Sequence, residues 1–265
     1  MKKWLKFVFP IFIFVAIAFA KNDVVQHKRA IIIGATSGIG KALTQVLLEK
    51  DYIVGATGRR IELLTELKKE YSDKLFIQKM DVTQVDDAIK SFNELVEQMK
   101  GVDVVVISSG IGYVNPDLDL QKELETVAVN VTGFVAMANA SYKYFEQQKS
   151  GHLVGISSIA SLIPNSYAPA YSASKAFEIN YLNSLRAKTY KSGLPITITE
   201  ILPGFVDTSM INKDEAFWVA TPQETAEQIY DAIESKKTRA YITRRWAIIA
   251  WLLKIMPNFI LNRFL

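Results

Sequence analysis

Near its start the chain reads Ala30-Ile31-Ile32-Ile33-Gly34-Ala35-Thr36-Ser37-Gly38-Ile39-Gly40, and this stretch decides the fold. Its first four residues form a short apolar run, as in a buried strand. The glycines then indicate a turn, and residues 41–50 continue with the apolar spacing of a helix. This order is typical of a dinucleotide-binding unit, because glycines let the backbone approach a pyrophosphate and a helix start favours its negative charge.

Further apolar runs alternate with helical patterns through the rest of the chain. They cover residues 53–57, 75–80, 104–107, 153–156 and 196–202. This alternation predicts a parallel sheet with helices on both faces, a single doubly wound α/β domain. The length of 265 residues suits one domain of this class, and no linker or repeat divides it.

A second informative stretch is Tyr171-Ser172-Ala173-Ser174-Lys175. In a helix, Tyr171 and Lys175 lie on the same face, so the ammonium would favour the ionised form of the phenol. A phenol assisted in this way can act as a general acid or base. The same spacing also occurs on ordinary surface helices, so the pair gains meaning only from the rest of the chain.

Taken together, these stretches resemble the short-chain dehydrogenase/reductase family from about residue 28 to about residue 245. The resemblance implies a Rossmann-type fold and an oxidoreductase that uses a nicotinamide cofactor. It implies a catalytic group made of Asn130, Ser158, Tyr171 and Lys175. Besides Tyr171 and Lys175, it implies cofactor contacts from Gly34, Thr36, Ser37, Gly38, Ile39, Gly40, Asp81, Val82, Ser109, Gly110, Pro203, Gly204, Val206 and Thr208.

The chemistry of the four catalytic candidates agrees with this resemblance. Hydride transfer to a carbonyl builds negative charge on its oxygen, and Ser158 can hold that oxygen while Tyr171 exchanges the proton. The resemblance implies that Lys175 also holds the nicotinamide ribose, and that Asn130 positions a water on the path to solvent. The simpler alternatives are that Ser158 caps a strand end and that Asn130 bonds a neighbouring strand.

Two departures from the family pattern concern the turn. Ile33 stands where the family usually has Thr, so a side-chain hydrogen bond within the turn is lost. Ser108-Ser109-Gly110 stands where Asn-Ala-Gly is common. Gly110 keeps the close backbone approach, while the support usually given by the Asn is missing.

The end of the second apolar run bears on the choice of cofactor. Gly58-Arg59-Arg60 follows it, and NAD-preferring relatives carry an acid there for the ribose hydroxyls. An acid would repel a 2′-phosphate, whereas arginine can make two charge-assisted bonds to it. The sequence therefore predicts NADP(H), with Arg59 on the phosphate and Arg60 stacked near adenine or solvated. A pair of exposed loop arginines is the alternative.

Composition excludes several other functions. The net charge is +4, and no basic cluster of the kind that binds nucleic acid is evident. The chain has no cysteine, and its two histidines, His27 and His152, have no motif partner. We therefore expect no thiol redox chemistry and no metal site.

Residues 1–27 form a distinct N-terminal segment. Three lysines precede an unbroken apolar run over residues 7–20. A cleaved signal fits the basic start and the small-residue site Ala18-Phe19-Ala20, and a membrane anchor fits too, although a straight span needs about 20 residues. We expect membrane association with the catalytic domain, residues 28–245, on the cytoplasmic side. Lysines before the run instead favour the far side, so an ER-lumenal or exported domain is the alternative.

Residues 246–265 are again apolar and basic, with Trp246 and Trp251 near Arg244 and Arg245. This composition suits a membrane interface, and a dimer contact, a wall of the substrate cleft and packing on the domain's own core are the alternatives. The two long helical regions, 120–150 and 169–190, resemble the pairing surface of family dimers, so we expect a homo-oligomer.

The substrate loop should run from Phe205 to about Ala220, and Leu162, Ile163 and Tyr167 should line the same cleft. Apolar lining predicts a hydrophobic ketone or aldehyde and its alcohol. The non-enzymatic alternative is an NADP-binding sensor or scaffold. A nucleotide-sugar epimerase or dehydratase is a further alternative, but the short C-terminal region leaves little room for a sugar-nucleotide domain. The sequence identifies neither the substrate nor the preferred direction of reaction.

Overall fold

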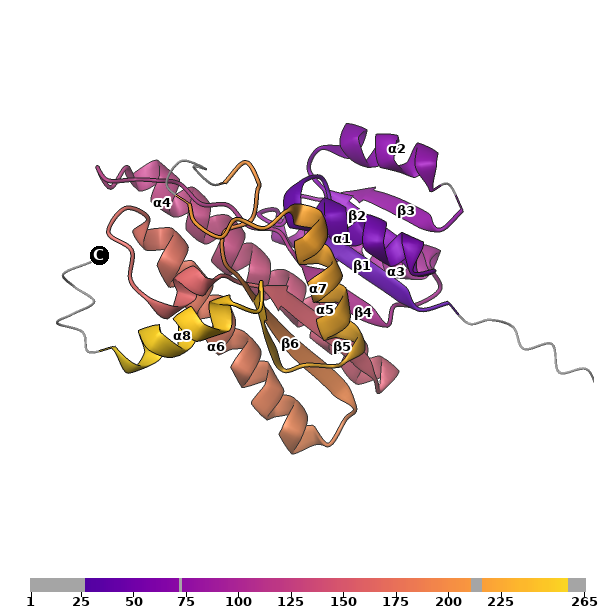
Figure 1. The fold of residues 1–265 in the computed structure, drawn as a ribbon. Coiled ribbons are helices and arrows are strands. Elements are labelled where there is room, and N and C mark those ends of the chain that lie inside the picture. The colour runs from indigo at the N-terminus through magenta and orange to yellow at the C-terminus, as the bar shows by residue number, and fades with distance from the viewer. Residues whose placement is uncertain (1–26, 72, 211–215, 257–265) are drawn as a thin grey trace, which may run out of the picture.

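The computed structural model describes residues 27–71, 73–210 and 216–256, and shows one sheet of parallel strands between two layers of helices (Figure 1). The strand order is β3-β2-β1-β4-β5-β6-β7. The strands are β1 (Arg29–Ile33), β2 (Ile53–Gly58), β3 (Leu75–Lys79), β4 (Val104–Ile107), β5 (Gly151–Ile156), β6 (Ile196–Pro203) and β7 (Arg239–Ile242). This confirms the doubly wound α/β fold.

Alternating side chains of the buried strands supply both faces of the sheet. In β1, Ile32 joins one apolar cluster and Ile31 the other. The first cluster packs against α1 (Gly38–Glu49), α2 (Ile61–Glu70) and α7 (Pro222–Glu234). The second packs against α3 (Val85–Gln98), α5 (Phe134–Gln148) and α6 (Pro169–Ser192).

The remaining helices are short. They are α4 (Leu120–Val127), η1 (Ala128–Gly133), η2 (Ile159–Leu162) and α8 (Trp246–Ile255). The segment η1 is a wider, π-helical turn that joins α4 to α5, so the region expected as one long helix is interrupted there. Thr221 caps the start of α7, because its side chain accepts a hydrogen bond from the Glu224 backbone.

The strand order reverses between β1 and β4, and this reversal positions the site. In open α/β sheets, ligands bind outside the carboxyl ends of the strands at such a switch point. The glycine turn follows β1 and residues 108–112 follow β4, so both stand at this edge. The observed bounds lie within one or two residues of the predicted runs, and β7 is a strand that the sequence reading did not identify.

The predictions for the two ends of the chain can be compared with the structure only in part. The apolar N-terminal run lies outside the described residues, as does the chain after Met256. Within the described ranges, no helix has both the length and the apolar composition needed to span a bilayer.

Candidate active site

The glycine turn leaves an open backbone surface. Gly34 and Gly38 have φ of 94° and 53°, values that side chains rarely allow. A Cβ on Gly34 would lie 2.6 Å from the Ser109 backbone nitrogen, and one on Gly40 would lie 2.1 Å from the Gly34 carbonyl oxygen. These positions therefore require glycine, and the N-terminus of α1 directly behind them favours an anion.

The segment after β6 reaches the same turn. A Cβ on Gly38 would come within 3.1 Å of the Thr208 methyl group. Val206 pairs with Ala220 in an isolated bridge, which holds the base of the loop. Two of the sequence motifs expected to contact the cofactor thus lie beside each other.

Gly58, at the end of β2, also faces the turn. A Cβ there would lie 2.5 Å from the methyl carbon of Thr36, so an acid could enter only if Thr36 moved. The Arg60 guanidinium donates hydrogen bonds to the hydroxyls of Thr36 and Ser37, each at 2.8 Å. Arg60 is thereby tied to the turn, which the sequence reading did not anticipate, while Arg59 is exposed.

The Asp81-Val82 pair connects the outer strand to the catalytic helices. The Asp81 carboxylate accepts hydrogen bonds from the Thr83 backbone and hydroxyl, and so shapes the turn after β3. Val82 packs on Gly133 at the end of η1, where an added Cβ would lie 2.6 Å from a Val82 methyl. This contact fixes the segment that carries Asn130.

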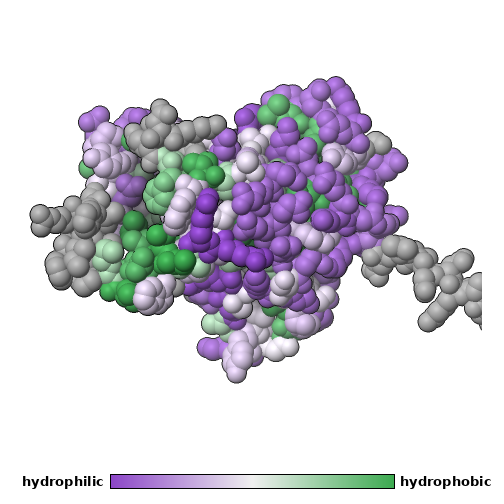
Figure 2. Space-filling view, in the orientation of Figure 1, coloured by the Kyte–Doolittle hydropathy of each residue, from purple (hydrophilic) through white to green (hydrophobic). Residues whose placement is uncertain are grey.

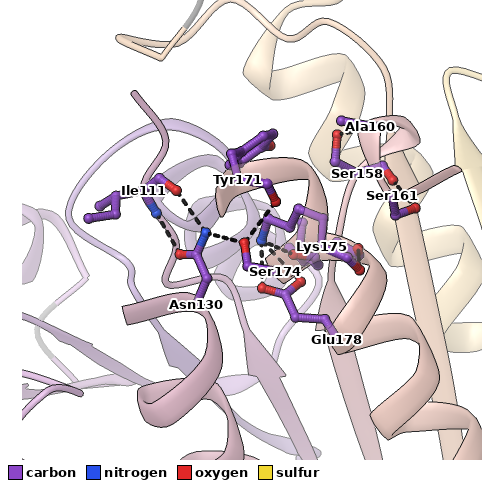
Figure 3. A network of polar contacts seen from close by, with 11 residues as sticks. Ile111, Asn130, Ser158, Ala160, Ser161, Tyr171, Ser174, Lys175 and Glu178 are labelled. Carbon is purple, nitrogen blue, oxygen red and sulfur yellow. Dashed lines mark hydrogen bonds and ion pairs between the residues drawn. The ribbon is translucent and has the colours of Figure 1, made fainter. Parts of the chain in front are cut away.

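Asn130 joins the loop after β4 to α6 (Figure 3). Its side chain accepts from the Ile111 backbone nitrogen at 2.9 Å and donates to the Ile111 carbonyl at 2.8 Å. It also donates to the Ser174 hydroxyl at 3.0 Å. Asn130 therefore bonds the backbone of the loop after β4, not that of a neighbouring strand, and it lies directly beside the Tyr171-to-Lys175 turn.

Tyr171 and Lys175 lie together at this site. The Lys175 ammonium nitrogen is 5.9 Å from the centre of the Tyr171 ring. A Cβ on Gly112 would lie 2.6 Å from Cδ2 of that ring, so the loop after β4 packs against the phenol. A Cβ on Gly110 would lie 3.2 Å from the Lys175 nitrogen and 3.5 Å from the Asn130 oxygen. The absence of side chains at Gly110 and Gly112 thus leaves room for Lys175 and Tyr171 at the edge of the sheet.

Glu178 is a functional candidate that the sequence reading missed. It is fully buried, and its two carboxylate oxygens accept hydrogen bonds from the Lys175 ammonium at 2.8 and 3.0 Å. Lys175 also donates to the Ile156 carbonyl at 3.2 Å. Burial raises the pKa of Glu178 to about 7, although Lys175 opposes the shift. No motif marks this acid, whose position one turn after Lys175 is the only available signal.

Ser158 follows β5 and caps η2. Its hydroxyl accepts a hydrogen bond from the Ala160 backbone at 3.1 Å, so the capping alternative is observed. Figure 3 shows Ser158 grouped with Ala160 and Ser161, apart from the contacts of Asn130. No hydrogen bond links Ser158 to Tyr171 in the part of the chain that the structure describes. A hydroxyl can accept and donate at once, so the capped serine retains a proton to donate.

Ser109 marks the cradle as a binding surface. Its hydroxyl is buried and has no hydrogen-bond partner among the described residues. Buried polar atoms are rarely left unpaired, so this atom, next to backbone that excludes any Cβ, fits a bound polar group such as a dinucleotide. The residues at the site therefore suit the predicted cofactor.

Neither histidine joins the site. His152 lies in β5, and its ring nitrogen is 2.7 Å from the Thr199 hydroxyl. Burial lowers the pKa of His152 to about 4. Among residues 27–71, 73–210 and 216–256, no three His, Cys, Asp or Glu side chains are grouped to hold a metal.

Aromatic side chains surround the base of the predicted substrate loop. Trp246 of α8 lies 5.6 Å from Phe205 and 5.2 Å from Phe217, measured between ring centres. Trp218 joins the same cluster at 6.0 Å from Trp246. The loop aromatics thus pack on α8, while Phe217 and Trp218 remain partly exposed.

A mostly apolar cavity of about 430 Å³ lies between η2 and α6. It is lined by Ser161, Leu162, Ile163, Pro164, Asn165, Pro169, Ser172, Ala173 and Ala176. Leu162 and Ile163 therefore line this cavity, whereas Tyr167 is exposed and lies outside the lining. No described residue of the predicted substrate loop lines it, so the expected shared cleft is not observed.

Comparisons with known proteins agree with this arrangement. A sequence model of the family described as short chain dehydrogenase matches residues 28–217. An uncharacterized oxidoreductase of Myxococcus xanthus (strain DK1622) is 29% identical over 245 residues, covering 88% of this chain and 94% of that protein. The NADP-dependent 3-hydroxy acid dehydrogenase of Escherichia coli (strain K12) is 31% identical over 179 residues, covering 66% and 71%. The closed form of serine dehydrogenase complexed with NADP+ has a TM-score of 0.70 at 27% identity, covering 77% of this chain and 88% of that one.

Proposed function

The chain belongs to the short-chain dehydrogenase family of oxidoreductases, and we propose that it interconverts a hydrophobic ketone or aldehyde and its alcohol with NADP(H). The observation that carries this proposal is the placement of Tyr171 and Lys175 beside a glycine cradle, with Asn130 bonded to the turn between them. This arrangement places a proton donor next to the surface that suits a dinucleotide.

Two features support NADP(H) over NAD(H). Gly58 has no room for the acid that would bind ribose hydroxyls, because Thr36 occupies the space. Arg59 and Arg60 supply positive charge at the same corner, and guanidinium groups bind phosphate in a forked geometry. The relative from Escherichia coli is named as NADP-dependent, and the serine dehydrogenase structure contains NADP+.

The side chains divide the chemical work in the reduction of a carbonyl. When bound, NADP(H) supplies the hydride. The Ser158 hydroxyl donates a hydrogen bond to the carbonyl oxygen and stabilises the negative charge that develops there. Tyr171 gives its phenolic proton to that oxygen, and the nearby Lys175 ammonium stabilises the charge left on the phenol. Asn130 holds the turn that carries Tyr171 in place.

The substrate proposal rests on the apolar surroundings. The cavity beside η2 is lined mainly by apolar groups, and the loop after β6, outside this lining, carries the partly exposed Phe217 and Trp218. Sites of this composition favour ligands with few polar groups. We place the reactive carbonyl near Ser158 and the apolar part of the substrate along η2.

The test is NADPH oxidation measured with purified full-length protein and a panel of hydrophobic aldehydes and ketones. We expect turnover with the wild type and a loss of about a hundredfold or more in Tyr171→Phe, because a positioned general acid contributes that much. NADPH binding, followed by its fluorescence, should remain. Tyr181→Phe is the matched control, because Tyr181 lies on the same helix but stacks on Phe177.

Two outcomes would contradict the proposal, one for the catalytic activity and one for the choice of cofactor. A wild-type protein that binds NADPH and turns over no carbonyl or alcohol would instead be a cofactor-binding sensor or scaffold. Arg59→Ala should weaken NADPH much more than NADH, and an equal loss for both would contradict the assignment of the cofactor.

A further inference from the structure

Helix α8 buries one face and leaves the opposite face uncovered. Trp246 is buried against the domain, whereas Ile248, Trp251, Leu252 and Ile255 are 40–63% exposed. Their spacing of i, i+3, i+4 and i+7 places all four on one helix face. Figure 2 shows hydrophobic residues gathered where Figure 1 places α8, beside a mainly hydrophilic surface. A contiguous apolar face of this kind indicates an interaction surface.

The loop after β6 packs against the start of α8 and carries exposed aromatic side chains of its own. Phe217 packs on Trp246, with ring centres 5.2 Å apart, yet remains about half exposed. The Arg245 guanidinium lies 5.2 Å from the Trp218 ring and donates a hydrogen bond to the Trp218 carbonyl. The exposed aromatics of the loop therefore pack at the start of α8, on the buried Trp246, and not on its exposed apolar face.

Positive charge borders the apolar face at the first turn of α8. Arg244 and Arg245 are both exposed there. They line a cavity of about 400 Å³ together with Thr243, Glu224 and Gln228. The Thr243 hydroxyl is buried and has no hydrogen-bond partner in the described part of the chain. The two guanidinium groups outnumber the one carboxylate, that of Glu224, so the cavity has an excess of positive charge that suits a phosphate ester.

We propose that the exposed face of α8 docks on an anionic lipid bilayer, with its apolar side chains at the interface and Arg244 at the headgroup phosphates. Tryptophan suits headgroup depth, because its ring is apolar and its N–H is polar. Arginine next to an apolar helix face adds attraction to anionic lipid. The residues beyond α8, 257–265, continue the same composition with Phe259, Ile260, Leu261 and Arg263.

A second copy of the chain is a poorer partner for this face. The helix α8 has ten residues, and four side chains form its exposed face. A stable protein interface takes about 20–30 residues from each partner. A bilayer has no such minimum, because apolar side chains insert one by one and each contributes.

Docking through α8 would also place the substrate cavity at the membrane surface. Helix α8 packs against η2, of which Ser161 and Leu162 line the cavity and Ser158 is the N-cap. If the proposed carbonyl chemistry holds, the substrate class is then a lipid-borne carbonyl or alcohol that enters from the bilayer. This step depends on the proposed function, whereas docking itself does not.

The test uses the full chain with vesicles of phosphatidylcholine alone or mixed with phosphatidylglycerol, both containing brominated acyl chains that quench tryptophan. The difference in quenching between wild type and Trp251→Phe isolates Trp251 from the other tryptophans. We expect this difference to be large with the mixed vesicles and small with phosphatidylcholine alone. Arg244→Gln should remove most of the preference for the anionic vesicles.

The paired variant Ile248→Asn/Leu252→Asn should remove most of the Trp251 quenching. The matched control is Leu120→Asn/Leu124→Asn, because these leucines are comparably exposed at the same spacing on α4; it should leave the quenching unchanged. The proposal is overturned if Trp251→Phe changes nothing in the mixed vesicles. It is also overturned if Trp251 becomes shielded from a water-soluble quencher as the concentration of lipid-free protein rises, because a second copy then covers the face. NADPH oxidation of soluble carbonyls is measured separately, so failure of docking and failure of the proposed chemistry are distinguishable.

Discussion

The buried Glu178 gives a prediction about how stability depends on pH. The perturbation is Glu178→Gln, which keeps the shape of the side chain and removes its titration. Burial raises the pKa of Glu178 from 4.5 to about 7. Between these values the folded protein binds more protons at this site than the unfolded chain does, so the free energy of unfolding falls as pH rises. The contribution of Glu178 is thus complete below about pH 4.5 and lost by about pH 7.

The magnitude follows from the size of the shift. Each pKa unit corresponds to about 1.4 kcal/mol, so a rise from 4.5 to about 7 corresponds to about 3 kcal/mol. We expect the free energy of unfolding of the wild type, minus that of Glu178→Gln, to fall by about this amount between pH 4.5 and 7. The assay is urea unfolding of both proteins, followed by circular dichroism across that pH range.

Glu234→Gln serves as a control of opposite sign. Burial alone would raise the pKa of Glu234, but hydrogen bonds from Lys28 and Tyr52 outweigh it and lower the pKa. Its stabilising contribution is therefore lost as pH falls, not as pH rises. A Glu178 difference that stays constant, or that grows with pH, would refute the reasoning, because Lys175 would then outweigh burial.

Three further variants test the geometry of the site. Gly112→Ala puts a Cβ 2.6 Å from the Tyr171 ring, so we expect kcat to fall by about a hundredfold with NADPH affinity unchanged, and a normal kcat contradicts the packing. Gly58→Asp should weaken NADPH and NADH alike in calorimetric titrations, because of the clash with the Thr36 methyl. Adding Thr36→Ser, which removes that methyl, should restore NADH binding alone. Arg60→Ala should lower NADPH affinity about tenfold and NADH affinity less, and equal losses argue against a phosphate contact.

The sheet could be predicted from sequence because its strands are buried on both faces. Runs such as residues 104–107 are continuously apolar, as expected of strands covered on both faces. The strand β7 was not predicted, because Arg239 and Tyr241 alternate with its two buried residues and interrupt the apolar run, as in a half-covered edge strand. The π-helical turn η1 was not predicted for another reason. Its residues have ordinary helical spacing, and nothing in the local sequence indicates the wider turn.

Site residues could be predicted where the chemistry requires a particular residue type at a fixed spacing. Residues whose position depends on tertiary packing could not. Thr36, Tyr171 and Lys175 belong to short motifs with fixed spacing, and the structure places them at one edge of the sheet. Glu178 reads in sequence as a surface acid, because it follows Phe177 in a mixed stretch of α6. Its burial results from three-dimensional packing, which no spacing rule contains.

The Lys175–Glu178 pair is better explained by function than by stability. Apolar residues of similar volume often stabilise a protein as well as a buried ion pair does, because the charges must be removed from water. A pair retained for stability alone would therefore gain nothing at this position. Lys175, however, stands beside the phenol of Tyr171, for which we propose the proton exchange, and Glu178 holds its nitrogen with two hydrogen bonds. Above about pH 7, where Glu178 is ionised, the carboxylate partly offsets the field of the ammonium at Tyr171, and below that pH the full field acts. The acid thus links the charge state of the site to pH within the range in which the enzyme would work.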